Sequence, residues 1–293
     1  MLNDVNETIA LLQSHNYIAD IGLATGIFLA LKMGKAIFLE GEPGVGKTEV
    51  AKVLSNALQT PLIRLQCYEG LDINHAVYEW NYSRQLLELQ ARQSDSESNT
   101  ATDHIFSEAF LLKRPLLQAI DQSNESSVVL LIDELDRADE EFESFLLELL
   151  SDFQITVPEI GTLHAKHKPI IIITSNRTRE IHDALKRRCI YHWIDYPSAE
   201  KELTIVRLKA PGIAETLSRQ IVSFVQCVRE QELYKPPGIA ETLDWAEALG
   251  YLQTQALSRE VVNRTLGLIL KYQDDVDRFR GNAVDEILDR IIS

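Results

Sequence analysis

The sequence is poor in cysteine and in basic residues, and it has no long uninterrupted hydrophobic run. Its cysteines, Cys67, Cys189 and Cys227, are odd in number and far apart, which excludes a disulfide framework or a CxxC metal site and indicates reduced thiols. The 29 basic and 44 acidic residues give a net charge of −15. This balance argues against a surface that wraps nucleic acid, which would be basic.

The hydrophobic stretch near the start, residues 21–31, is interrupted at Lys32 and is too short to span a bilayer. The polar and acidic opening MLNDVNET lacks the features of a signal peptide. His164 and His167 lie close together, but no acidic or cysteine partner gives them the spacing of a metal site. We therefore expect a soluble, cytoplasmic protein that is long enough, at 293 residues, for two domains.

The most informative motif is GEPGVGKT, from Gly41 to Thr48, between an apolar run at 36–39 and a helix-forming run at 49–54. This order is typical of a P-loop, in which backbone N–H groups cradle phosphate oxygens. We expect Lys47 to reach the β- and γ-phosphates of ATP and the Thr48 hydroxyl to hold Mg²⁺. The residues expected at the nucleotide are Tyr17, Ile18, Gly41, Glu42, Pro43, Gly44, Val45, Gly46, Lys47, Thr48 and Glu49.

Apolar runs alternate with segments of helical spacing along the first two thirds of the chain. The runs predict strands at 36–40, 62–65, 128–132, 169–173 and 190–194. Helical spacing is found at 4–14, 17–32, 107–121 and 140–151, and a β-hairpin insert is predicted at 153–167. This alternation predicts an α/β fold with a five-stranded, doubly wound parallel sheet between helices.

The composition changes after Pro197, beyond which only helical periodicity is found. We therefore predict an α/β core at 1–197 and an all-helical domain at 198–293. The stretch 92–104 is rich in Ser, Thr, Asn and Asp and is predicted to be a mobile loop. The heptapeptide PGIAETL occurs twice, at 211–217 and 237–243, and each copy is a plausible helix start.

Asp133 and Glu134 follow the apolar run 128–132, as the acidic pair of a Walker B motif does. We expect Asp133 to hold the Mg²⁺ shell and Glu134 to polarise the water that attacks the γ-phosphate. The alternative is that both only begin a solvated acidic run that continues with Asp136 and Asp139. The apolar run favours the first interpretation, because a buried strand that leads to an acidic pair needs a cation at its tip.

Three further residues are candidates for catalysis. Asn176 ends the neighbouring predicted strand, where its amide can orient the attacking water; a simple Asn turn is the alternative. Arg187 and Arg188 end a short predicted helix, where they either complement the helix dipole or supply charge to a neighbouring subunit as an arginine finger. Arg188, which directly precedes Cys189 and the last predicted strand, is our choice for the finger.

Longer blocks of the sequence resemble a known family. The segments GEPGVGKTEVAK, LLIDELDRADEEFESFLLELLSD, VPEIGTLHA and IIITSNRTREIHDALKRRCIYHWIDYP resemble AAA+ ATPases of the MoxR family. The segments IRLQCYEGLD, YEWNYSRQLL and KPPGIAETLDWA are similar to its branch associated with maturation of molybdenum-containing carbon monoxide dehydrogenase. The resemblance extends over about residues 17–275.

The resemblance implies a P-loop AAA+ core with a small all-α lid that moves over the nucleotide, in ring hexamers with ATP between subunits. It also implies a chaperone-like hydrolase that remodels a metalloenzyme, here a molybdenum hydroxylase or a similar client, with a partner that bears a von Willebrand factor A domain. By position in the family's motifs, Lys47 and Thr48 bind phosphate and Mg²⁺, and Asp133 and Glu134 form Walker B. Asn176 is sensor 1 and Arg188 is the finger.

The sequence departs from the family at the sensor 2 arginine, because the stretch 256–260 lacks the usual small-residue turn. Arg259 is the candidate and Arg264 the alternative; the plain interpretation of Arg259 is a first-turn helix residue after a Ser258 cap.

Two other function classes share the ATPase core. A nucleic-acid motor or clamp loader is disfavoured by the acidic charge, and a non-hydrolysing scaffold is disfavoured by Glu134 and Asn176, which it would not need. A GTPase is disfavoured because no NKxD guanine-recognition motif is found.

Overall fold

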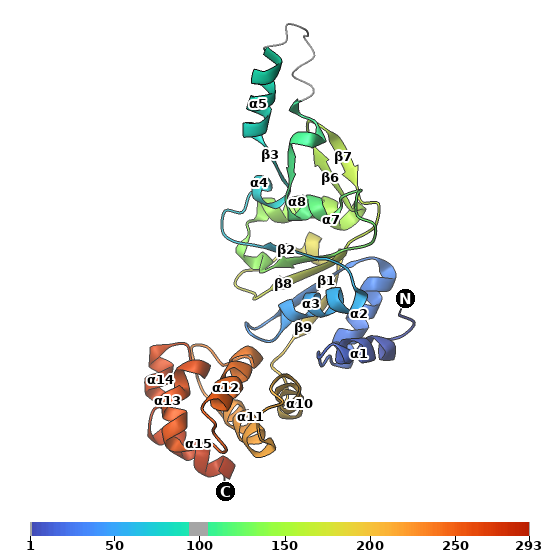
Figure 1. Cartoon of the computed structure of the whole chain (residues 1–293). Helices are drawn as coiled ribbons and strands as arrows, with labels where there is room; N and C mark the ends of the chain where they lie inside the picture. The colour runs from blue at the N-terminus through green and yellow to red at the C-terminus, as the bar shows by residue number, and fades with distance from the viewer. Residues whose placement is uncertain (1, 94–104, 293) are drawn as a thin grey trace. The chain divides into compact units, whose positions relative to one another are not determined.

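The computed structural model describes residues 2–93 and 105–292, which divide into two compact units (Figure 1). The α/β unit consists mainly of residues 21–40 and 48–193, and the helical unit mainly of residues 9–20, 41–47 and 194–292. The P-loop segment 41–47 thus clusters with the helical unit. Of the predicted loop at 92–104, residues 94–104 lie outside the described residues, and residues 92 and 93 end helix α5 (Tyr82–Gln93).

The α/β unit is built on a five-stranded sheet with the strand order β2-β5-β8-β1-β9. Its strands are β1 (Ala36–Gly41), β2 (Leu62–Gln66), β5 (Val129–Asp133), β8 (Ile170–Ser175) and β9 (Cys189–Ile194). The pairs β2–β5, β5–β8 and β8–β1 are parallel. The prediction of an α/β fold with a five-stranded parallel sheet is confirmed.

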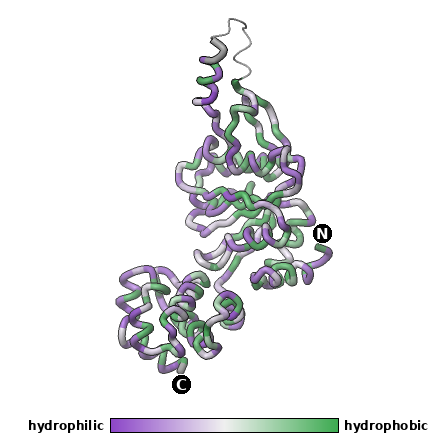
Figure 2. Tube along the Cα trace, viewed as in Figure 1, coloured by the Kyte–Doolittle hydropathy of each residue, from purple (hydrophilic) through white to green (hydrophobic). Residues whose placement is uncertain are grey.

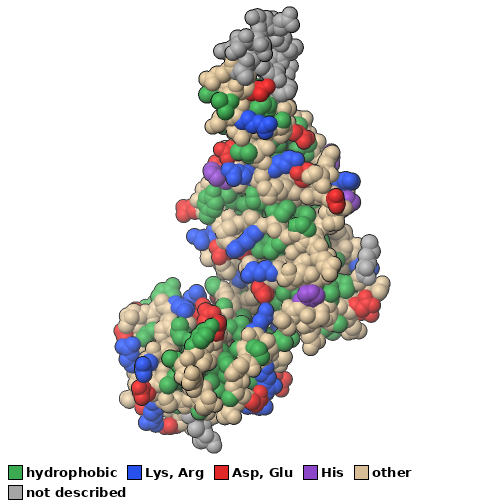
Figure 3. Space-filling model, viewed as in Figure 1, with side chains coloured by type: hydrophobic (Ala, Val, Ile, Leu, Met, Phe, Trp, Pro, Cys, Tyr) green, Lys and Arg blue, Asp and Glu red, His purple; other side chains and the backbone are tan. Residues whose placement is uncertain are grey.

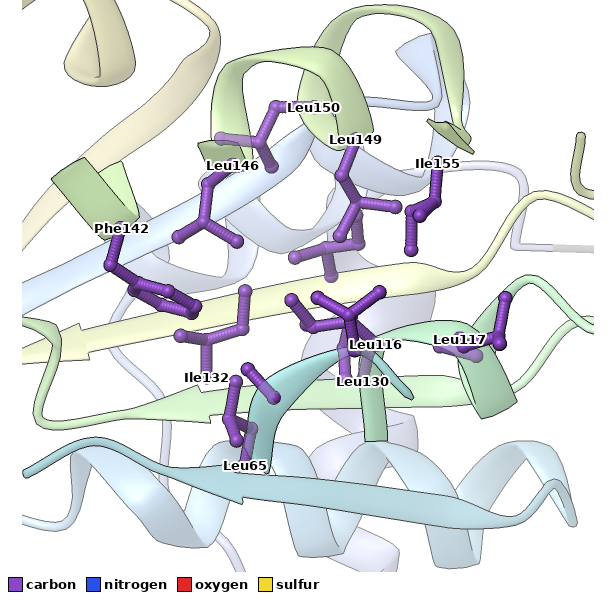
Figure 4. Close-up of a cluster of buried hydrophobic side chains, with 14 of the residues drawn as sticks. Leu65, Leu116, Leu117, Leu130, Ile132, Phe142, Leu146, Leu149, Leu150 and Ile155 are labelled. Atoms are coloured by element: carbon purple, nitrogen blue, oxygen red, sulfur yellow. The ribbon is translucent and has the colours of Figure 1, made fainter. Parts of the chain in front are cut away.

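The sheet is apolar on both faces, as its sequence predicts. Every residue of β1 and β5 is buried, and Figure 2 shows hydrophobic residues along the central strands. In Figure 4, Leu130 and Ile132 of β5 point toward Phe142 and Leu146 of helix α8 (Glu140–Asp152). Full burial of each such side chain contributes about 1.5–3 kcal/mol to the free energy of folding. The packing of α8 on the sheet therefore holds β5 in place.

Helices and short strands complete the α/β unit. They are α2 (Ile21–Met33), α3 (Lys47–Leu58), α4 (Ile73–Ala76), β3 (Tyr78–Trp80), α5, the 3₁₀ turn η1 (Glu108–Phe110), β4 (Leu111–Lys113), α7 (Pro115–Ala119), the 3₁₀ turn η2 (Leu135–Arg137), α8, β6 (Gln154–Val157), β7 (Gly161–His164) and α9 (Asp183–Lys186). Helix α1 (Val5–Ser14) crosses the boundary between the units. Strands β6 and β7 pair antiparallel, so the predicted hairpin insert is confirmed.

Two predicted helices are wrong in extent. The segment 107–121 is not one helix, because Leu111–Lys113 pair antiparallel with Tyr78–Trp80. Arg114 is extended ahead of Pro115, a residue that disfavours helical geometry at the position before it, and α7 begins at that proline. The helix predicted at 17–32 begins only at Ile21.

The helical unit contains only helices among its described residues beyond Ile194. They are α10 (Ala199–Lys209), α11 (Glu215–Arg229), α12 (Ile239–Tyr251), α13 (Arg259–Ile269), α14 (Gln273–Phe279) and α15 (Asn282–Ile292). The second PGIAETL copy starts α12 directly after Gly238, whereas α11 starts at the fifth residue of the first copy, Glu215. In the described ranges, none of the helices is long and apolar enough to cross a membrane.

A buried ion pair ties three of these helices together. The Glu202 carboxylate, which is fully buried, accepts hydrogen bonds from Arg229 at 2.6 and 2.7 Å and from Thr242 at 2.7 Å. Arg229 also donates to the Pro237 carbonyl at 2.6 Å. Because each of these partners is satisfied, the network fixes the turn from which α12 begins.

Candidate nucleotide-binding site

The P-loop adopts a backbone that only glycine tolerates at its critical positions. Gly44 and Gly46 have φ of 78° and 95°. Gly41 lies so close to the Ile194 carbonyl that a Cβ on it would be 2.2 Å from that oxygen. The glycine spacing of the motif is therefore required by positive φ at two positions and by close backbone approach at the third.

Lys47 begins helix α3 and its ammonium group lies against the loop. Its Nζ donates to the carbonyl oxygens of Gly41 and Glu42, each at 2.7 Å, and the residue is buried. The loop thus holds a charged donor at the N-terminus of a helix, where backbone N–H groups and the helix dipole also favour an anion. This arrangement suits phosphate.

The start of α12 contacts the same loop. The Ala240 N–H donates to the Gly44 carbonyl at 3.2 Å. A Cβ on Gly238 would be 2.8 Å from the Gly44 backbone, and a Cβ on Gly44 would be 2.9 Å from a Glu241 carboxylate oxygen. Gly44 and Gly238 therefore pack directly against each other. The sequence did not predict this contact, because local patterns contain no information about contacts between distant segments.

Asp133 ends β5, is only 2% exposed, and collects partners from three neighbouring elements. Its Oδ1 accepts from the hydroxyls of Thr48 at 3.0 Å and Thr174 at 2.6 Å. Its Oδ2 accepts from Arg64, at 3.1 Å from Nε and 2.6 Å from Nη2. The carboxylate is therefore fully hydrogen-bonded and is compensated by a guanidinium.

The two predicted magnesium ligands lie together. The Thr48 hydroxyl and the Asp133 carboxylate are hard oxygen donors at hydrogen-bonding distance, and Mg²⁺ is usually bound by one or two protein oxygens, with water and phosphate completing the shell. These residues fit the ion. In the part of the chain that the structure describes, no group of three or more His, Cys, Asp or Glu side chains forms a metal cluster.

Glu134 has a left-handed backbone conformation, with φ of 55°. Its N–H donates to the Thr174 hydroxyl at 2.9 Å, and its side chain accepts from Arg137 at 3.2 Å. A non-glycine residue in this region costs of order 1–3 kcal/mol and persists only where its surroundings hold it. Here Thr174 holds it, since the same hydroxyl bonds the Glu134 backbone and the Asp133 side chain.

Asp136 is only 3% exposed, so it does not belong to a solvated acidic run. Its carboxylate accepts from the N–H groups of Asn176 at 3.1 Å and Thr178 at 2.9 Å, and from the Thr178 hydroxyl at 2.7 Å. Asp136 thereby fixes the turn that follows β8, on which Asn176 lies. Asp139 is also structural, since it caps α8 by accepting from the Phe142 N–H.

The two candidate finger arginines differ in their surroundings. Arg188 is half-buried and donates to the Ser151 hydroxyl at 2.6 Å and the Ala184 carbonyl at 2.8 Å. Arg187 is exposed, and no side chain or backbone group of the described chain lies within hydrogen-bonding distance of its guanidinium. Both arginines lie at the end of α9, next to β9.

The candidate sensor 2 arginines are bonded to carboxylates of the helical unit. Arg259 pairs with Asp285 at 3.3 Å and Asp289 at 3.1 Å, and Ser258 caps α13 as its plain interpretation requires. Arg264 pairs with Glu260 on the same helix. Tyr17 and Ile18 are half-buried in the segment between α1 and α2.

The pKa of Cys67 is affected by the negative charge at this edge of the sheet. Burial raises its pKa to about 12, and the negative charges of Asp133, Asp136 and Glu134 add to that effect. The thiol therefore stays protonated at neutral pH, and Cys67 is a free cysteine, as predicted. The same carboxylates make this edge attractive to a cation.

The comparisons with known proteins agree with this geometry. Residues 36–189, which are just over half of the chain, match the model of the AAA domain (dynein-related subfamily). The chain therefore belongs to this AAA-domain family. At that level it is a member of a family of nucleotide-hydrolysing ATPases, whose nucleotide is typically bound with Mg²⁺ and whose members commonly form rings.

Individual similar proteins add no description of function. Two uncharacterised proteins, from two strains of Staphylococcus epidermidis, are 26% and 25% identical over 205 residues, which cover 68% of this chain and 70% of each relative. Among solved structures, a mutant of Thermotoga maritima RuvB is 18% identical with a TM-score of 0.49 and covers 87% of this chain and 70% of that chain. The T. maritima RuvB Holliday junction branch migration motor is 15% identical with a TM-score of 0.46, covering 90% and 68%. Likeness at this level concerns the fold and carries no conclusion about function.

Sequence reasoning missed the residues that support the acidic pair. Thr174 is the residue after Ile173, which pairs with Ile132 in the register, and Arg64 lies two residues before the pair Gln66–Asp133. A polar residue inside an otherwise apolar strand was the available signal for both. Its meaning depends on the strand order, which the sequence alone did not provide.

We predict that Thr174→Val leaves the fold intact but lowers ATP hydrolysis by roughly ten- to a hundredfold, because loss of the hydroxyl releases the Glu134 backbone and misplaces its carboxylate. Steady-state phosphate release measures the effect. Thr174→Ser, which keeps the hydroxyl, is the matched control and should retain most activity. Equal loss in both variants would contradict this explanation, because Thr174→Ser keeps the hydroxyl that makes the hydrogen bonds.

Proposed function

We propose that this chain hydrolyses ATP with Mg²⁺ at the P-loop and the Walker B pair, and that it works as an oligomeric, MoxR-type remodeller. The observation that carries the ATPase proposal is the Asp133 centre, where Thr48 and the acidic strand end converge at 3.0 Å. The P-loop with its positive-φ glycines and Lys47 supplies the phosphate-binding half. The α/β core at 1–197 and the helical lid at 198–293 belong to the same proposal.

The roles follow from the chemistry of the side chains. Lys47 neutralises the β- and γ-phosphates, exchanging its two carbonyl partners for phosphate oxygens. Thr48 and Asp133 hold Mg²⁺, which when bound withdraws charge from the phosphate oxygens. Glu134 accepts the proton of the attacking water. Asn176, at the end of the neighbouring strand, orients that water through its neutral amide.

Charge supplied across a subunit boundary completes the proposed site. Arg188 is the proposed finger, with Arg187 as the second candidate, since Arg187 is exposed and Arg188 would have to exchange its bonds to Ser151 and Ala184. The nucleotide would then be shared between neighbours in a ring, for which a hexamer is proposed. Arg259 or Arg264 would act as sensor 2 only after leaving its present carboxylate partners.

The biological role rests on the resemblance of whole sequence blocks to the molybdenum-associated MoxR branch. One of those blocks forms β3 and the start of α5, where Tyr82, Leu86 and Leu87 are 66%, 57% and 66% exposed. Such apolar side chains are available for a protein client. On the face that Figure 3 shows, basic and acidic side chains are interspersed, which does not resemble a basic track for nucleic acid. We therefore propose a metalloenzyme client, with a partner that bears a von Willebrand factor A domain.

Glu134→Gln should bind ATP with unchanged affinity but hydrolyse it at least about a hundredfold more slowly, because the amide keeps the shape and loses the basicity. A fluorescent ATP analogue measures binding, and phosphate release measures turnover. Lys47→Ala is the complementary control and should lose binding itself. Normal turnover of Glu134→Gln would assign water activation to another residue.

Mixing tests the shared site. Arg188→Ala should bind ATP yet be inactive alone, and so should Glu134→Gln. Mixed oligomers contain interfaces that join an intact Glu134 to an intact Arg188, so activity should return in the mixture. Arg187→Ala is run in parallel, because the finger is whichever arginine shows this complementation. If neither mixture recovers although mass measurement confirms mixed oligomers, the shared-site proposal is wrong.

The Glu134→Gln protein, held in its ATP-bound form, should retain the client or the partner in a pull-down from native extract. We expect a von Willebrand factor A protein or a molybdenum enzyme in the eluate, identified by mass spectrometry. Lys47→Ala serves as the control and should not retain them. Recovery of nucleic acid with its binding proteins instead would favour the motor class.

A further inference from the structure

Arg64 is a side chain to which neither the sequence motifs nor the proposed mechanism assigns a role. It lies on β2, the outermost strand of the order β2-β5-β8-β1-β9, and its side chain is 50% exposed. Its guanidinium nevertheless reaches the Oδ2 atom of Asp133, whose side chain is only 3% exposed. An exposed arginine on an edge strand is thus bonded to the buried carboxylate at the centre of the site.

The register of the sheet makes this contact possible. Gln66 is opposite Asp133 and Arg64 is opposite Leu131. Side chains two residues apart in a strand lie on the same face, so Arg64, Gln66 and Asp133 share one face of the sheet. Arg64 Nη2 also donates to the Gln66 side-chain oxygen, which steadies the guanidinium beside the carboxylate.

The contact provides the buried carboxylate with the cation that its burial requires. Removing the partner of a buried charge is strongly destabilising, because the remaining charge is left without compensation. The hydroxyls of Thr48 and Thr174 occupy Oδ1 and carry no charge. Of the three side chains that donate these hydrogen bonds to the Asp133 carboxylate, Arg64 is the one that carries a positive charge.

We propose that Arg64 is an internal cation that competes with the divalent metal for Asp133, and so sets the metal concentration at which the site loads. This inference rests on the proposed nucleotide site and extends it. Arg64 is a positioning residue and does not touch the reacting atoms. Its half-exposed side chain allows the guanidinium to move into solvent when the metal takes its place, whereas a fully buried arginine would have no such path.

The proposal predicts that Arg64→Gln weakens the folded protein but makes its site easier to load with metal. Without metal or nucleotide the variant should unfold at a lower temperature than the wild type, since Asp133 loses its compensating charge. With nucleotide, however, it should need less Mg²⁺. We expect the Mg²⁺ concentration that half-saturates the magnesium-dependent binding of a fluorescent ADP analogue to fall on the order of tenfold, between the limits expected for exposed and buried ion pairs.

The experiment uses the full chain, with fluorescence anisotropy of the ADP analogue during a Mg²⁺ titration and thermal unfolding in EDTA. Arg64→Lys keeps the charge and should stay within about threefold of the wild type, because the proposed competition depends mainly on charge. Arg114→Gln is the matched control. It removes an arginine from an ion pair with Glu79 in the same unit and should leave the Mg²⁺ requirement unchanged.

Each outcome decides the question. A fall in stability with an unchanged Mg²⁺ requirement would make Arg64 purely structural, and a raised requirement would show that Arg64 orients Asp133 for the metal; both overturn the proposal. If the wild type itself shows no magnesium-dependent nucleotide binding, it is the proposed nucleotide site that fails, and the two failures are thereby distinguished.

Discussion

The burial of a carboxylate at the end of a strand is the constraint on which the rest of the site depends. Asp133 ends a strand whose five residues are all buried, so water cannot compensate its charge. Two hydroxyls and a guanidinium, from α3, β8 and β2, donate hydrogen bonds to it instead. The same constraint explains why strands far apart in sequence must meet in one register, because the donors come from neighbouring strands on either side.

Strain is concentrated where these strands end. Glu134 and Arg177 have φ of 55° and 57°, and they follow the ends of β5 and β8 closely. Neighbouring side chains stabilise both turns. Thr174 accepts from the Glu134 N–H in the first turn, and Asp136 accepts from the Asn176 N–H in the second. Because β5 and β8 are parallel, Glu134 and Asn176, which directly follow their last residues, lie at the same edge of the sheet. Neither is part of the core, whereas Leu135, the residue after Glu134, is fully buried.

Much of the fold was predictable because apolar runs determine it. The strands predicted at 128–132 and 169–173 differ from β5 and β8 by a residue or two at their ends. The segment 107–121 was not predictable in the same way, since its apolar spacing suits a helix while Leu111–Lys113 pair with β3. Local periodicity contains no information about such a partner, and Pro115 was the only local signal that the helix could not begin earlier.

The candidate site shows the same division. The P-loop and the acidic pair follow from motifs, because their chemistry is carried by residues adjacent in sequence. Arg64 and Asp136 do not, because their roles depend on which strands are neighbours and on burial. Asp136 in particular looked like one acid in a solvated run, yet its carboxylate is the acceptor that fixes the turn after β8.

The charges expected to act on the nucleotide are compensated by the chain itself. Lys47 donates to the carbonyls of Gly41 and Glu42, and Asp133 accepts from Arg64. Binding of phosphate and metal is therefore an exchange of partners, and its free energy is the difference between the new bonds and those given up. A ligand that satisfies only one of the two groups leaves the other bound to the chain. In the proposed function, phosphate and divalent metal together would release both groups, so the site would bind a metal–nucleotide complex more favourably than either component alone.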